Sequence, residues 1–268
     1  MRDVDFGPAL LFCPADRPER FAGALAKADG VILDLEDAVL PEAKEQAREN
    51  IVAATLDPSR VIVRVNDPTS AEFAADIEAL ARTPYRTVMI AKAEDPAAFD
   101  AFDASHRLIA LCETARGVHR AGEIAAHPRV AALMWGAEDL VASLGGMASR
   151  TADGRYRDVA RHARSAVLIA ASAHGKAAVD AVHLDIDDEP GLAEEAADAV
   201  ASGFRATACI HPKQVAVIRA AYRPDPATQE WARAVLAAAE GERGVFRFEG
   251  RMVDEPVLRH ARAVLARA

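Results

Sequence analysis

Eight short apolar runs, separated by segments with helical character, constrain the fold of this chain more than any other feature of its sequence. The runs are ALLFCP from Ala9, GVILDLED from Gly30, RVIVRVN from Arg60, TVMIAKA from Thr87, LIALCE from Leu108, VAALMWG from Val130, DAVHLDI from Asp180 and ATACIH from Ala206. Their near-continuous hydrophobicity is typical of parallel strands that are covered on both faces. Helix signals lie between the runs, as in Pro41–Ala54 and Arg157–His174.

Two α/β architectures accommodate this pattern. Eight β–α units can close a barrel, whereas a doubly wound open sheet usually has fewer strands and a glycine-rich phosphate loop after the first. The first run here ends in CPADRPER, which has no such loop, and 268 residues suit a single α/β barrel. We therefore predict a (β/α)8 TIM barrel over residues 1–220, with the open sheet as the alternative.

Residues 221–268 continue the chain without a further apolar strand run. The pattern predicts a helix over Pro226–Glu240, a loop with the sequence FRFEGRMVDEP, and a final helix that reaches Ala268. No glycine- or serine-rich linker precedes this segment. We predict a C-terminal helical extension of the barrel rather than a separate second domain.

The charge balance bears on possible partners. The formal net charge of −9 argues against nucleic acid, because binding a phosphate backbone depends on clustered Lys and Arg. The start, MRDVDFGPAL, lacks the apolar stretch of a signal peptide, and no run reaches transmembrane length. Cys13, Cys112 and Cys209 lie inside apolar runs without metal-ligand spacing, which indicates buried free thiols. We expect a cytoplasmic protein with neither a membrane nor a nucleic-acid partner.

Polar residues gather where several of the apolar runs end. Barrel enzymes place their chemistry at the carboxyl ends of the strands. The residues at these ends are Asp34, Glu36, Asp37, Arg64, Asn66, Lys92, Glu94, Glu113, Glu138, Asp139 and His211. A single carboxylate in this position has a second interpretation, because Asp37 or Asp139 could cap the helix that follows. Together on one rim of a barrel, however, they predict a functional site.

Glu113 and Asp139 form the candidate pair of metal ligands, because they end neighbouring runs. Hard cations such as Mg²⁺ take carboxylate oxygens and retain waters that a substrate can displace. Arg64 supplies a planar cationic group for a carboxylate or a polarised carbonyl. The residues therefore predict a divalent cation, Mg²⁺, held by Glu113 and Asp139 beside an anion-binding arginine.

Zinc and a cysteine nucleophile receive less support from the residues. The histidines show no HxxxH or His/Cys spacing, which argues against zinc. Cys112 directly precedes Glu113, and successive strand residues face opposite sides. If Glu113 faces the site, Cys112 faces the packing instead. We interpret His183 as a core or rim histidine of the seventh predicted strand.

Several ordered motifs resemble the citrate lyase beta-subunit-like proteins of the HpcH/HpaI aldolase superfamily, in particular the stand-alone bacterial members. The motifs are CPADRPERF, VILDLEDAV, VIVRVN, LCETARGV, WGAEDL, DAVHLDI, CIHPKQV and FEGRMVDEPVL, and they span nearly the whole chain. The resemblance implies Mg²⁺ as the cofactor and coenzyme A as part of the substrate.

The resemblance also implies roles for individual residues. Glu113 in ETARG and Asp139 in GAEDL match the Mg²⁺ ligands, and Glu113 also lies beside the substrate. Arg64 in VRVN matches the contact to a substrate carboxylate or carbonyl. Gly136 and Ala137 match a position that offers backbone N–H groups to an anionic oxygen.

For the C-terminal extension, the resemblance implies a homotrimer in which residues 221–268 pack over the barrel of a neighbouring subunit. Asp254 in the MVDEP motif then acts as the catalytic acid/base. The residues themselves also favour a local role, since an aspartate before Glu255-Pro256 is a good N-cap for the last helix. Both roles can coexist.

We therefore predict a Mg²⁺-dependent carbon–carbon lyase that cleaves or forms a β-hydroxyacyl-CoA thioester, such as malyl-, citramalyl- or citryl-CoA, with a 2-oxo acid partner. One alternative is a CoA-independent class II aldolase that acts on free 2-oxo acids. Another is a non-catalytic subunit that binds acyl-CoA. Citrate cleavage itself belongs to a multi-subunit complex, and we do not expect the alpha and gamma subunits of citrate lyase as partners.

Overall fold

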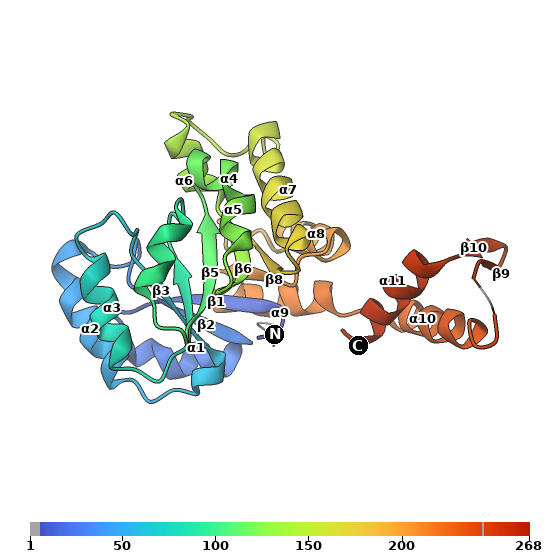
Figure 1. Cartoon of the computed structure of the whole chain (residues 1–268), viewed down its shortest axis with the longest axis horizontal. Coiled ribbons are helices and arrows are strands. Elements are labelled where there is room, and N and C mark those ends of the chain that lie inside the picture. Colours follow the sequence, from blue (N-terminus) through green and yellow to red (C-terminus); the bar gives the residue numbers. More distant parts are fainter. Residues whose placement is uncertain (1–5, 243) are drawn as a thin grey trace. The chain divides into compact units, whose positions relative to one another are not determined.

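The chain forms two compact units, Met1–Ile218 and Arg219–Ala268. The structure is a computed structural model that describes residues 6–242 and 244–268. In Figure 1, the first unit is a set of strands with helices around them, and the second consists of helices and a small hairpin.

The strands of the first unit close into one parallel barrel. They are β1 Ala9–Pro14, β2 Gly30–Asp34, β3 Val61–Val65, β4 Thr87–Ile90, β5 Arg107–Cys112, β6 Val130–Trp135, β7 Ala177–Asp180 and β8 Ala206–Cys209. Each pairs with its neighbour in sequence, and β1 also pairs with β8, with Leu10 opposite Ala208. This closure excludes the open sheet and confirms the predicted (β/α)8 barrel.

Helices lie between most successive strands, and one more helix follows β8 and continues into the second unit. They are α1 Phe21–Lys27, α2 Lys44–Ala53, α3 Phe73–Ala81, α4 Ala115–His119, α5 Ala121–Ala126, α6 Ala137–Ser143, α7 Asp158–Ala173, α8 Glu189–Ser202 and α9 Pro212–Tyr222. Short 3-10 helices span Pro18–Arg20, Pro41–Ala43, Pro58–Arg60 and Pro96–Ala101. Side-chain caps define several starts: the Thr114 hydroxyl accepts from the Gly117 N–H and begins α4.

The seventh strand differs from its prediction. The apolar run was placed from Asp180 onwards, but β7 covers Ala177–Asp180 and ends there. Two alanines begin the true strand, and alanine has low strand propensity, so the segment does not stand out in the sequence. The following residues form a loop, in which His183 is buried and its Nδ1 lies 2.8 Å from Glu195 Oε2. The prediction of His183 in a strand was therefore wrong, whereas its burial was expected.

Period-two alternation decides which side chains enter the barrel. Ile62 and Leu111 belong to the apolar core inside the barrel. Arg64 and Glu113 follow each of them by two positions and therefore share the inner face. Cys112 lies between Leu111 and Glu113, is fully buried and has a pKa raised by burial to about 12, so it is not poised as a nucleophile.

The C-terminal unit has a small core of its own. Its elements are α10 Pro226–Ala238, β9 Phe246–Phe248, β10 Arg251–Val253 and α11 Glu255–Leu265. Its buried residues are Ala232, Val235, Val253, Ala261 and Val264. The two helices agree with the sequence, but the predicted loop contains an antiparallel hairpin, with Arg251 opposite Phe248. Strands of three residues are too short to give a recognisable apolar run.

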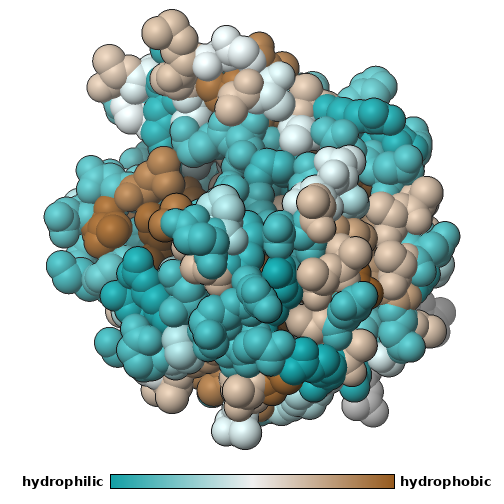
Figure 2. All heavy atoms as spheres, turned by 90° about the vertical axis from the view of Figure 1, so that its left-hand side faces the viewer, coloured by the Kyte–Doolittle hydropathy of each residue, from teal (hydrophilic) through white to brown (hydrophobic). Residues whose placement is uncertain are grey.

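Within residues 6–242 and 244–268, no helix combines the length and the apolar character that a membrane span requires. Figure 2 shows one face, on which hydrophilic residues predominate and hydrophobic residues form separate patches.

Candidate active site

A cavity of ≈ 350 Å³ lies at the carboxyl ends of the barrel strands. Its apolar wall includes Phe12, Leu111 and Met134. Its polar lining residues are Asp34, Asp37, Arg64, Glu113, Glu138 and Asp139. Gly136 and Ala137 line it as well. The first unit thus brings together the substrate-binding and metal-ligand candidates predicted within the barrel, which are Arg64, Glu113, Gly136, Ala137 and Asp139.

Arg64 is fixed by two carboxylates. Its Nε and Nη2 donate to Asp34 Oδ1 at 2.7 Å and Oδ2 at 2.6 Å, and its Nη1 lies 2.9 Å from Glu36 Oε2. Its guanidinium also stacks over the Phe12 ring at 4.8 Å. Burial lowers the pKa of Arg64, but the attraction of Asp34 and Glu36 outweighs this and raises it overall. These contacts leave N–H donors of the guanidinium for a ligand oxygen.

Glu113 is a buried residue whose side chain lines the cavity. It is 3% exposed, and its Oε1 accepts from the Lys92 backbone N–H at 3.0 Å. Burial raises the pKa of Glu113 to about 8; Arg64 opposes the rise, while Asp139 and Glu36 add to it. A buried carboxyl group beside other carboxylates ionises much more readily when a cation is bound next to it, which suits a metal ligand.

Gly136 makes room for this carboxylate. A Cβ atom added at Gly136 would lie 2.9 Å from both the Cβ and Oε2 of Glu113. The backbone φ of Gly136 is −132°, so the requirement for glycine is steric and not conformational. Gly136 therefore leaves space for Glu113, a role that the sequence motif alone does not show.

Asp139 stands in the first turn of α6. The N-cap of this helix is Gly136, and no side chain caps it, so the alternative interpretation of Asp139 as a helix cap was wrong. Its Oδ1 lies 3.4 Å from Lys92 Nζ, and its side chain is about one-third exposed. Asp139 therefore does not cap the helix, and it lines the cavity together with Glu113.

Other residues of the predicted rim have structural partners. Asn66 binds the carboxylate of Asp76, with its Nδ2 at 2.7 Å from Oδ2. Glu94 accepts from the Thr114 hydroxyl at 2.7 Å. The His211 ring accepts from the Lys213 N–H at 3.2 Å. None of these three lines the cavity.

A buried lysine below the site was missed in the sequence. Lys44 on α2 donates from Nζ to the carbonyl oxygens of Leu35 at 2.7 Å and Glu36 at 3.0 Å, and to Asn66 Oδ1 at 2.7 Å. It fixes the chain that carries Glu36, which in turn contacts Arg64. A lysine on a helix normally faces solvent, and Lys44 lies at the start of α2, well beyond the end of β2 at Asp34, so no local signal marks it.

Asp254 belongs to the C-terminal unit. It is the N-cap of α11, and its Oδ1 accepts from the Val257 N–H at 3.4 Å, a long hydrogen bond. The capping role expected from the residues is therefore present. Its role as acid/base stays a prediction.

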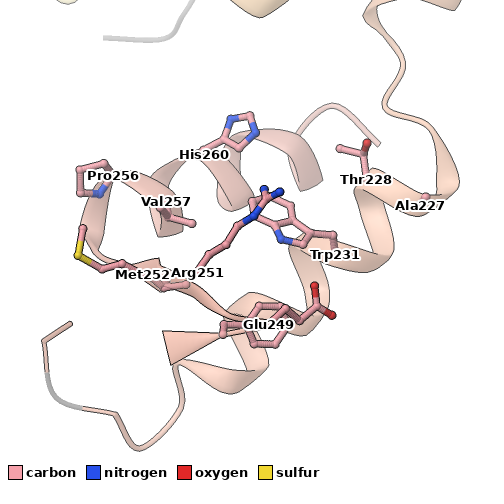
Figure 3. Close-up of a pocket in the computed structure, with 11 residues that line it drawn as sticks. Ala227, Thr228, Trp231, Glu249, Arg251, Met252, Pro256, Val257 and His260 are labelled. Carbon is pink, nitrogen blue, oxygen red and sulfur yellow. The ribbon is translucent and has the colours of Figure 1, made fainter. Parts of the chain in front are cut away.

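The C-terminal unit also contains a pocket of ≈ 890 Å³ (Figure 3). Trp231 and His260 face each other there, with ring centroids 5.7 Å apart, and Arg251 projects between the two helices and the hairpin. Glu249 is the single carboxylate among its described lining residues. This pocket lacks a carboxylate pair, so the barrel cavity is the better candidate for metal chemistry.

Comparison with known proteins gives a consistent result. The family model "HpcH/HpaI aldolase/citrate lyase" matches residues 9–212. A citrate lyase subunit beta-like protein of Mycobacterium tuberculosis is 58% identical over 98% of this chain and 96% of its own length. A (3S)-malyl-CoA thioesterase of Cereibacter sphaeroides is 35% identical over 97% of this chain and 94% of its own.

A crystal structure of the protein CitE from Mycobacterium tuberculosis, in complex with magnesium, acetoacetate and coenzyme A, superimposes with a TM-score of 0.93. It is 57% identical in sequence and covers 99% of both chains. The predicted resemblance to citrate lyase beta-subunit-like proteins is confirmed. The chain therefore belongs to the HpcH/HpaI aldolase/citrate lyase family.

Proposed function

We propose that this chain is a Mg²⁺-dependent carbon–carbon lyase that cleaves or forms a β-hydroxyacyl-CoA thioester of the malyl-, citramalyl- or citryl-CoA type, with a 2-oxo acid as the partner. The observation that carries the proposal is the convergence of Glu113, Asp139 and Arg64 on one cavity at the strand ends. The complex of the CitE relative with magnesium, acetoacetate and coenzyme A supports it.

Glu113 and Asp139 fit a Mg²⁺ ion by their chemistry. Mg²⁺ commonly uses one or two protein carboxylates and completes its shell with water and substrate oxygens. In the described part of the chain, no three His, Cys, Asp or Glu side chains are grouped as a metal site, which agrees with a site that substrate completes. When bound, Mg²⁺ would supply Lewis-acid stabilisation of negative charge on the oxygens of a 2-oxo acid.

Arg64 would bind the carboxylate or carbonyl oxygen of the 2-oxo acid. Its contacts to Asp34 and Glu36 fix the direction of the N–H donors that remain for this oxygen. The apolar wall of Phe12, Leu111 and Met134 reduces the water around this oxygen, which strengthens the interaction. In the cleavage direction, the β-hydroxyl loses its proton, the carbon–carbon bond breaks, and the acyl-CoA enolate takes up a proton. The products are a 2-oxo acid and an acyl-CoA.

We further propose that residues 221–268 pack over the barrel of a neighbouring subunit in a homotrimer, and that Asp254 there exchanges the proton of the acyl-CoA α-carbon. Large apolar side chains on the loops that follow the barrel strands support this proposal. Leu40, Met147, Leu184 and Ile210 are all exposed. Of these, Leu184 and Ile210 line the cavity. Exposed apolar side chains beside a polar site are typical of a surface that another protein covers.

Steady-state assays with a panel of β-hydroxyacyl-CoA thioesters test the function. Purified protein with Mg²⁺ should release a 2-oxo acid, trapped as its hydrazone, with an equal amount of acyl-CoA and no free thiol. Free thiol without 2-oxo acid would instead show thioester hydrolysis, the activity that the name of the Cereibacter sphaeroides relative states.

The same assay separates the two alternatives when the corresponding free hydroxy acids are added to the panel. Cleavage of free hydroxy acids without coenzyme A would favour the CoA-independent class II aldolase. Binding of acyl-CoA without turnover of any member would favour the non-catalytic subunit. Either result contradicts the proposed function.

A further inference from the structure

Lys92 places a positive charge among the acidic residues of the site. It follows β4, and its Nζ contacts the carboxylate of Glu36. The same nitrogen lies 3.5 Å from Asp37 Oδ2 and 3.4 Å from Asp139 Oδ1. Its side chain is one-quarter exposed, so water screens these attractions only in part.

The backbone of Lys92 also contacts an acidic residue of the site, and it does so in an unusual conformation. Lys92 has a φ of 47°, and Glu249 is the other residue besides glycine with positive φ among those that the structure describes. A side chain makes this conformation unfavourable, so it persists only where the surroundings hold it. In this conformation the Lys92 N–H donates to Glu113 Oε1 at 3.0 Å.

One residue thus holds both candidate metal ligands, Glu113 through its backbone and Asp139 through its side chain. We propose that Lys92 is a positioning residue that sets the affinity of the site for divalent cations. The Lys92 ammonium attracts the Asp139 carboxylate, and this contact must weaken when Asp139 binds a divalent cation. The positive charge of Lys92 also repels the divalent cation. The proposal rests on the assignment of Glu113 and Asp139 as metal ligands.

The charges around Lys92 predict the direction of the effect. Removing the ammonium leaves Glu36 paired with Arg64 Nη1 at 2.9 Å, while Asp139 loses the cation that lies 3.4 Å from its Oδ1. The site then becomes more negative and Asp139 is free for the incoming cation. Two unit charges about 4 Å apart interact in bulk water by an amount that corresponds to roughly a fivefold change in binding, and the interaction is stronger near a protein surface. Lys92→Met should therefore tighten cation binding by at least about fivefold.

The test is a titration with Mn²⁺, followed by the EPR signal of the unbound ion, with Mg²⁺ as a competitor. Lys92→Met should lower the Kd for both ions, and Lys92→Arg, which keeps the charge, should stay within about twofold of the unmodified protein. Lys27→Met removes an exposed cation elsewhere and controls for net charge. An unchanged or higher Kd in Lys92→Met would overturn the proposal.

Thermal unfolding gives a second readout that a merely structural lysine would not produce. Lys92→Met should unfold at a lower temperature than the unmodified protein in EDTA, and should gain more stability from a fixed Mg²⁺ concentration. A lower unfolding temperature without a larger Mg²⁺ effect would contradict the proposal.

Glu113→Gln and Asp139→Asn separate this proposal from the metal assignment. If both variants lose Mn²⁺ binding while Lys92→Met leaves the Kd unchanged, the metal site stands and the role of Lys92 fails. If neither variant affects Mn²⁺ binding, the metal assignment and the role of Lys92 fail together.

Discussion

Glu113 carries a carboxyl group into a part of the barrel that water hardly reaches. Its pKa of about 8, raised mainly by burial, lies far above the ordinary value of 4.5. Near neutral pH the folded protein therefore keeps a proton on Glu113 that the unfolded chain, with a pKa near 4.5, has already released. A group of this kind adds stability below pH 4.5 and loses that contribution as the pH rises through about 8.

This linkage predicts the behaviour of Glu113→Gln. In EDTA, the free energy of unfolding of the unmodified protein should fall between about pH 5 and pH 8, and Glu113→Gln should reduce the fall because glutamine does not titrate. Urea unfolding at several pH values measures it. Glu45→Gln, an exposed site on α2, is the matched control and should reproduce the unmodified profile.

Gly136 permits a second prediction for a single residue. In Gly136→Ala the new Cβ would lie 2.9 Å from the Cβ and Oε2 of Glu113, so the carboxylate must move. Displacement of a metal ligand should reduce Mg²⁺ affinity and turnover about 10- to 100-fold. Calorimetric titration with Mg²⁺ and the lyase assay measure these changes.

Gly122→Ala on α5 is the control for this variant, because a Cβ there meets no atom within 4 Å. It should leave activity unchanged and add up to about 1 kcal/mol of helix stability. Equal activity of both variants would show that Gly136 does not protect the position of Glu113.

At the scale of elements, α2 supports the end of β2. Lys44 Nζ donates to the carbonyl oxygens of Leu35 and Glu36 and to the side chain of Asn66, which directly follows β3. Lys44→Met should destabilise the protein by about 1–3 kcal/mol, because these buried acceptors lose a donor. It should also lower turnover, since Glu36 helps to fix Arg64.

Chemical denaturation and the lyase assay check the Lys44 prediction together. Gln46→Ala alters an exposed hydrogen bond to Asn50 on the same helix and should change the free energy of unfolding by less than about 0.5 kcal/mol. A Lys44→Met variant as stable as Gln46→Ala would show that the buried contacts carry little energy.

At the scale of the whole molecule, the proposed trimer predicts complementation between subunits. Glu113→Gln and Asp254→Asn should each be nearly inactive as separate proteins. After subunit exchange in a mixture, about a quarter of the sites should combine an intact barrel with an intact Asp254 from a neighbour, if the interface is cyclic. Activity should then reappear in the lyase assay.

A mixture of Glu113→Gln with Asp139→Asn is the matched control, because both changes affect the same barrel cavity. It should stay inactive in any arrangement of subunits. Absence of recovery with Asp254→Asn, despite exchange shown by native mass spectrometry, would argue that Asp254 does not act in a neighbouring site.

The sequence alone was sufficient for the barrel and for the charged residues that line its cavity. Seven of the eight apolar runs mark the strands, and a strand-end position with period-two alternation is enough to direct Arg64 and Glu113 inwards. These features are local, because hydrophobic periodicity and the face to which a strand side chain points both depend on neighbouring positions along the chain. The weak seventh strand, which begins with two alanines, was misplaced for the same reason.

Only the tertiary structure decided how the charges pair. Arg64 could have met any of several carboxylates, and the fold gives it Asp34 and Glu36. The fold also turns Lys92 towards Glu113 and Asp139, and buries Lys44 beneath the site. These contacts join residues far apart in the sequence, and Coulomb attraction has no sequence periodicity. These contacts form because closure of the barrel brings the ends of all strands to one rim. The apolar pattern of a single strand does not specify which charged residues then meet.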